Sequence, residues 1–159
     1  MQDMLVKLYD LPQGSGTAAA EDETVVIRRA MAPDMLRVVE WVRNQSGISA
    51  AGECTMCFQT HPITCYIATR GKQILGYACY NATAPDFFGP TAVAEAERGK
   101  GIGRALLLRS LASLREEGYG YAIIGGVAPA AFYEKTVGAT LIPGSTPGVY
   151  RDFLGGMKE

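Results

Sequence analysis

The sequence lacks the features that mark several classes of protein. It holds one histidine and one tryptophan, and its 15 basic side chains balance 16 acidic ones, for a formal net charge of −1. A general nucleic-acid binder carries a basic face, so this balance argues against one. No apolar run approaches the roughly 20 residues that span a bilayer, and no basic segment followed by an apolar one opens the chain. We therefore expect a cytoplasmic protein without nucleic-acid or membrane partners.

Cysteine is scarce, and four residues in a reducing compartment suit free thiols better than disulfides. Cys54, Cys57, His61 and Cys65 follow the order of a zinc knuckle, C-x-x-C-x4-H-x4-C, which is a nucleic-acid-binding module. Both later gaps are one residue short, and the turn glycines of a knuckle are missing. We expect no metal site and keep the knuckle as the weaker alternative function.

What the sequence does contain fits one compact domain, since 48% of its 159 residues are hydrophobic. Residues 1–23 are predicted to form a short strand, over 4–11, and a flexible connector rich in Gly, Ala and acidic residues. Residues 24–159 form the domain itself.

Apolar and β-branched runs predict strands over 24–29, 64–69, 74–80, 87–94, 121–127, 139–142 and 149–153. Helical spacing of apolar residues predicts one helix from residue 33 and others over 53–58, 102–117 and 130–137. This order predicts an α/β (α+β) fold, a mixed central sheet with helices on both faces.

The loop before the long predicted helix is the richest segment. It runs Arg98, Gly99, Lys100, Gly101, Ile102, Gly103, Arg104. Glycines let a ligand approach backbone N–H groups closely, and the first N–H groups of a helix have no partner within it. We expect this loop to hold a pyrophosphate, although the spacing fits neither G-x-G-x-x-G nor a Walker A loop. A glycine-rich turn that binds nothing is the structural alternative.

Arg98-x-x-Gly101-x-Gly103 resembles the (Q/R)-x-x-G-x-(G/A) acyl-CoA loop of the GCN5-related N-acetyltransferases (GNAT). Downstream, Phe132-Tyr133-Glu134-Lys135 is similar to the FY-x-x-x-G-F signature of that family, and the resemblance covers about residues 24–142. It implies a mostly antiparallel sheet, acetyl-CoA as co-substrate, and backbone amides from residues 98–104 on the pyrophosphate. It also implies a bulge near Val93 and Ala94 that contacts the pantetheine arm and the acetyl carbonyl.

Acetyl transfer needs a neutral amine, N–H donors for the oxyanion and a proton for the leaving thiolate. By resemblance, Tyr133 matches a tyrosine near the CoA sulfur, where a phenol of pKa near 10 stays protonated and can donate. Packing beside Phe132 is the alternative role. Candidates for the general base are Glu53, Glu95 and Glu97. We predict Glu53, because its segment forms the acceptor wall in the family.

The resulting prediction is an acetyl-CoA-dependent N-acyltransferase. It moves acetyl to the primary amine of a small molecule or peptide, by direct attack in a ternary complex. A non-catalytic acyl-CoA-binding module, which would keep the loop without using Tyr133, is the alternative. Homodimers are common in such folds, and the N-terminal strand is the candidate for joining two copies. The acceptor itself carries no recognisable motif.

Overall fold

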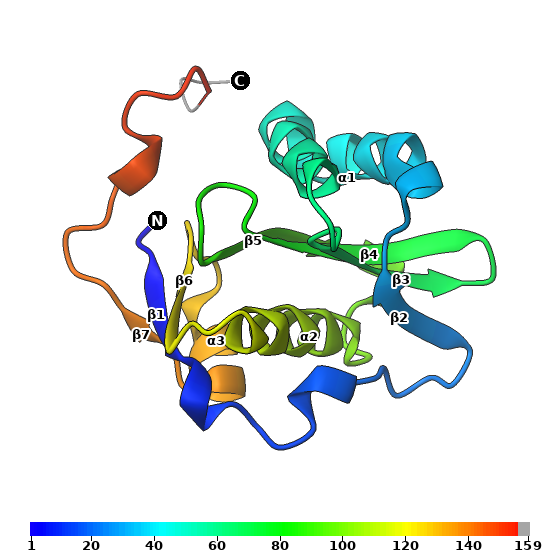
Figure 1. The fold of residues 1–159 in the computed structure, drawn as a ribbon, viewed down its shortest axis with the longest axis horizontal. Helices are drawn as coiled ribbons and strands as arrows, with labels where there is room; N and C mark the ends of the chain where they lie inside the picture. The colour runs from blue at the N-terminus through cyan, green and yellow to red at the C-terminus, as the bar shows by residue number, and fades with distance from the viewer. Residues whose placement is uncertain (156–159) are drawn as a thin grey trace.

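A seven-stranded sheet forms the centre of the computed structural model, which describes residues 1–155 (Figure 1). Its strands in chain order are β1 (Met4–Lys7), β2 (Val25–Arg29), β3 (Cys65–Arg70), β4 (Gln73–Tyr80), β5 (Phe87–Val93), β6 (Tyr121–Ile124) and β7 (Thr140–Leu141). In space they lie in the order β2-β3-β4-β5-β6-β1-β7. Only β5 and β6 run parallel, and the other neighbours are antiparallel. The predicted mixed, mostly antiparallel sheet is confirmed.

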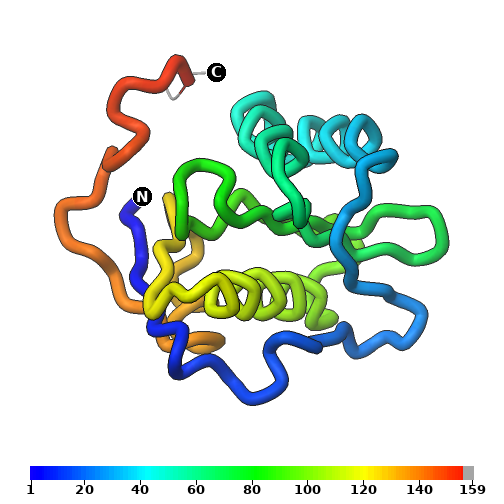
Figure 2. Tube along the Cα trace, viewed as in Figure 1, coloured from blue at the N-terminus to red at the C-terminus, as the bar shows by residue number. Residues whose placement is uncertain are grey.

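Helices cover both faces of this sheet, as predicted (Figures 1 and 2). The helix α1 (Met35–Met56) packs on one face, where Val38 and Val42 are fully buried. On the other face lie α2 (Ile102–Glu116) and the short α3 (Ala130–Val137). The sheet therefore separates two apolar cores, and the larger one lies on the α2 side.

The two long helices show how local patterns set boundaries. In α2 the stripe Leu107, Leu111, Leu114 is buried, and the chain turns away at Gly118, where φ is +104°. Two separate helices were predicted in the region of α1. The structure also has two helices here, but they meet at Gly47 (φ 91°, ψ 177°), earlier in the chain than the predicted start of the second helix at residue 53.

The N-terminal strand lies inside the sheet. Met4 pairs with Ile124 of β6 on one side and with Leu141 of β7 on the other, so β1 is not the outermost strand of the sheet. That this strand joins two copies stays a prediction. The strand also ends at Lys7, and a 3-10 turn (Leu8–Asp10) replaces its predicted second half.

The segment predicted to be a flexible connector lies against α2. Arg109 Nε donates to the carbonyl of Ala18 over 2.8 Å, and Ser15 is buried. The extended strand predicted over 149–153 is also wrong, because a 3-10 turn (Gly148–Tyr150) stands there with Gly148 at φ +60°. The last four residues of the predicted domain, 156–159, lie outside the described residues.

All four cysteines are free thiols. Within residues 1–155, the helices fall short of the length and apolar character that crossing a bilayer demands.

Candidate functional site: two hollows that meet at Tyr133

The strands β5 and β6 diverge, and this places the candidate site. They pair only at Phe87–Ile123 and Phe88–Ile124. Beyond these pairs two hollows open, of about 510 and about 600 Å³, and the same three residues line both: Phe88, Thr91 and Tyr133. The hollow that contains the glycine-rich loop is called the cradle below, and the other is called the chamber.

An irregularity in β5 accompanies this divergence. The pairing of β4 with β5 shifts between Ala78 and Tyr80, opposite Gly89 and Pro90. Proline has no N–H to donate to a neighbouring strand, which suits it to an irregularity. The bulge was predicted near Val93 and Ala94, so the structure places it closer to the start of the strand.

The same pairing separates the two predicted oxyanion donors. The N–H of Ala94 donates to the carbonyl of Leu75 over 2.8 Å and is therefore not available to a ligand. Because successive N–H groups of a strand point in opposite directions, the N–H of Val93 turns toward the side from which β6 has diverged. Val93 also lines the cradle, whereas Ala94 does not.

The cradle brings together most of the residues predicted to bind the cofactor. Those that line it are Val93, Arg98, Gly99, Gly101, Ile102, Gly103 and Arg104. Gly99 and Gly101 have φ near +80°, a conformation that favours glycine, and Gly101 caps the start of α2. A Cβ atom on Gly103 would already lie 3.6 Å from a methyl group of Val93, so a larger side chain would extend into the hollow. Unpaired N–H groups at a helix start, with room for close approach, fit a pyrophosphate.

Charge on the rim of the cradle is partly neutralised within the protein. Glu97 forms ion pairs with Arg70 (2.7 Å) and with Lys100 (3.1 Å), which does not line the cradle. Hydrogen bonds from Arg70 and then Lys100 lower the pKa of Glu97 to about 2. Such a carboxylate is a poor proton acceptor, and the exposed Glu95 lines neither hollow. Glu97 lines the cradle as an ion-paired carboxylate, and of the three predicted bases it is Glu53 that lines the chamber.

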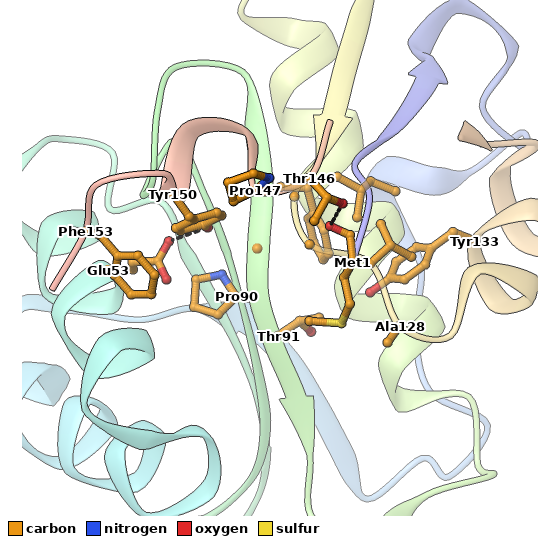
Figure 3. Close-up of a pocket in the computed structure, with 16 residues that line it drawn as sticks. Met1, Glu53, Pro90, Thr91, Ala128, Tyr133, Thr146, Pro147, Tyr150 and Phe153 are labelled. Atoms are coloured by element: carbon orange, nitrogen blue, oxygen red, sulfur yellow. Dashed lines mark hydrogen bonds between the residues drawn. The ribbon is translucent and has the colours of Figure 1, made fainter. Parts of the chain in front are cut away.

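Glu53 and Tyr133 lie at opposite ends of the chamber (Figure 3). The second half of α1 supplies Glu53, and two hydroxyls hold its Oε2 atom. Tyr150 donates to Oε2 over 3.1 Å, and Thr83 also donates to it. Burial raises the pKa of Tyr150, which keeps its hydroxyl protonated as a donor.

Tyr133 is held by packing. Its ring contacts Phe132 edge-on at 5.1 Å between centroids and Phe88 at 6.4 Å, and the residue is 7% exposed. Burial raises the pKa of Tyr133 above its usual value. The hydroxyl makes no hydrogen bond within residues 1–155, and Figure 3 shows it turned toward the chamber. It is therefore a free proton donor at the junction of the two hollows.

The zinc-knuckle set is not brought together. The sulfur atoms of Cys54, Cys65 and Cys79 lie within 4.8 Å of one another, in the core between α1 and the sheet. His61 is exposed and belongs to no such cluster in the described part of the chain. Burial raises the pKa of the Cys79 thiol, as expected of a core residue. The predicted set of three thiols and one imidazole is therefore not assembled in the described part of the chain.

Sequence reasoning missed the two hydroxyls that hold Glu53. Thr83 lies in the turn between β4 and β5, and Tyr150 lies in the segment predicted as a strand. No local signal marks either residue, because each contact joins segments at least 30 positions apart in the chain.

The acetyltransferase (GNAT) domain family matches residues 61–136, which include the cradle, Tyr133 and the strands between them. The resemblance of this sequence to the GCN5-related N-acetyltransferases is confirmed over residues 61–136. No curated protein matches it.

Solved GNAT structures share the fold. One is a GCN5-related glucosamine N-acetyltransferase region of a fungal multi-domain GH3 β-N-acetylglucosaminidase, 12% identical, with a TM-score of 0.68 over 89% of this chain and 19% of that one. Another is a GCN5-related N-acetyltransferase from Sphaerobacter thermophilus, 17% identical, with a TM-score of 0.62 over 89% of this chain and 48% of that one. The chain thus spans half or less of the length of these two solved chains. The predicted GNAT-like fold is confirmed.

Proposed function

We propose that this GNAT domain transfers an acetyl group from acetyl-CoA to the primary amine of a small molecule or peptide, by direct attack in a ternary complex. The observation that carries the proposal is the meeting of two hollows at Tyr133. A direct transfer needs both substrates bound at once, with the reacting atoms in contact. One hollow fits a pyrophosphate, and the other is free for an acceptor.

The cradle would hold acetyl-CoA through the backbone N–H groups of Ile102, Gly103 and Arg104, with Arg98 and Arg104 adding positive charge. When bound, acetyl-CoA supplies the acetyl thioester. The N–H of Val93 is the proposed donor to the carbonyl oxygen as that oxygen gains negative charge.

Tyr133 is the proposed general acid. As the new N–C bond forms and the C–S bond breaks, the departing sulfur needs a proton, and the hydroxyl of Tyr133 is free to supply it. The raised pKa keeps that hydroxyl protonated at neutral pH. Glu53 as general base stays a prediction, and from the far end of the chamber it would act through water.

The test is a panel of primary amines with acetyl-CoA, monitored by release of free thiol from the purified chain. We expect thiol release that depends on the amine and yields one acetylated product per thiol. If acetyl-CoA binds but no amine accelerates thiol release, the chain is the non-catalytic acyl-CoA-binding module of the alternative. We place the reaction in the cytoplasm, a reducing compartment that suits four free thiols.

A further inference from the structure

Glu53 is a half-buried carboxylate without a cationic partner among the described residues. Its Oε2 atom accepts hydrogen bonds from Thr83 and Tyr150, and no described residue donates to Oε1. A carboxylate partly removed from water is stabilised when a cation or a further donor meets it. Because Glu53 lines the chamber, that cation can come from a ligand.

The position of Glu53 shows which part of a ligand it would meet. Figure 3 places Glu53 at one end of the chamber and Tyr133 at the other, with Pro90 and Thr91 between them. The proposed function puts the reacting amine beside Tyr133, where the two hollows join. The carboxylate of Glu53 therefore faces the end of the acceptor that is farthest from the acetyl group.

The walls of the chamber restrict the rest of the acceptor. No Lys, Arg or His side chain lines the chamber in the described part of the chain, so a carboxylate or phosphate on the acceptor would meet no basic side chain there. Apolar side chains such as Phe88, Ile124 and Val127 form much of the wall. A hydrocarbon body between two polar ends fits this surface.

We propose that the acceptor is a diamine without an acidic group. One amino group, in its neutral form, is acetylated beside Tyr133, while the second, as an ammonium, is held by Glu53. Thr83 and Tyr150 position the carboxylate. The neutral nitrogen forms the new N–C bond and gives its surplus proton to water, the C–S bond breaks, and the distal ammonium keeps its proton throughout. This inference rests on the proposed function and makes Glu53 a specificity residue.

Thiol-release kinetics with two matched series of acceptors test the proposal. One series is of α,ω-diamines of increasing length, and the other is of monoamines with the same carbon chains. A charge-assisted hydrogen bond is worth roughly tenfold to a hundredfold in binding. We expect the best diamine to have a KM at least tenfold below that of its monoamine. Glu53→Gln should remove this advantage by raising the diamine KM to that of the monoamine.

Glu40→Gln is the control variant, since Glu40 is exposed on the same helix and lines neither hollow. It should behave like the wild type. Equal KM values for diamines and monoamines in the wild type would overturn the proposal. So would a Glu53→Gln variant that loses kcat for both series alike, because that is the behaviour of a general base.

Calorimetric titration of the chain with diamine, in the presence of saturating CoA, separates this inference from the proposed function. Diamine binding that requires Glu53, without acetylation of any amine, would support the diamine site and contradict the enzyme. Acetylation of monoamines and diamines with equal efficiency would support the enzyme and contradict the diamine site.

Discussion

The ring of Tyr133 is positioned by packing against other aromatic side chains. Two aromatic contacts, with Phe88 and Phe132, fix the ring, while the hydroxyl stays without a partner in the described part of the chain. Removing the hydroxyl should therefore leave packing intact, because no hydrogen bond is broken. This separation between ring and hydroxyl makes Tyr133 suited to a single-atom test.

Tyr133→Phe should lower kcat and kcat/KM alike, with the KM for acetyl-CoA little changed, because a proton donor needed only in the transition state is lost. General acids contribute about 10²–10⁴-fold, so we expect a fall of at least tenfold, measured where chemistry limits turnover. Tyr121→Phe is the control, as this exposed tyrosine lines neither hollow. Near-full kcat in Tyr133→Phe would leave Tyr133 a packing residue.

The pH profile of the same reaction follows from the environment of Tyr133. Burial disfavours the charged phenolate, so the pKa of Tyr133 lies above its ordinary value of 10.0. The acid form thus predominates through pH 7–9, and kcat in the wild type should show no decline in that interval. An alkaline limb with a pKa near 8 would assign the proton to a different group.

At the scale of elements, the start of α2 and the end of β5 act together. The turn that begins α2 relies on Gly101 in the left-handed region, and Gly103 faces Val93 across the cradle. The cradle thus lies between the first turn of α2 and the part of β5 that no longer pairs with β6. Both partners are held by the larger core.

Gly103→Leu should abolish the rise in melting temperature that acetyl-CoA causes by binding the folded state. The leucine side chain would occupy the cradle beyond the position of its Cβ atom. Gly52→Leu is the control, because it makes the same change at an exposed helical glycine with open space around it. An unchanged shift in Gly103→Leu, measured by thermal unfolding with and without acetyl-CoA, would place the ligand elsewhere.

What the sequence predicted well was local. The stripe of Leu107, Leu111 and Leu114 lies within one helix, the stop at Gly118 follows directly after it, and the loop motif lies within eight residues. What it could not predict depends on distant pairing. Glu53 meets Tyr150 across 97 positions, so the chamber wall and the turn at Gly148–Tyr150 follow only from the folded chain.

The whole molecule depends on the placement of β1. Met4, Val6 and Leu8 are fully buried in the larger core, and β1 joins β6 to β7. The residues near the start of the chain thereby contribute to the half of the molecule that carries Tyr133. Substitutions that remove buried side chains of β1 should therefore lower the free energy of unfolding of the whole domain.

Val6→Ala should lower the free energy of unfolding by about 2 kcal/mol, the loss of two buried carbon groups plus a small cavity. The control is Val26→Ala, the same change on β2 at a residue that is 52% exposed, where we expect less than about 0.5 kcal/mol. Urea unfolding of both variants measures the difference. Equal effects would mean that β1 does not belong to the core.

The position of β1 also bears on how the protein is made. A ribosome releases Met4–Lys7 well before their partners, residues 121–124 and 140–141. At a synthesis rate of about 5–20 residues per second, roughly 6–25 seconds pass between the synthesis of β1 and that of β6. During that interval its apolar side chains have no sheet to join, and they are open to chaperones. The strand is thus synthesised long before it can reach its native position between β6 and β7.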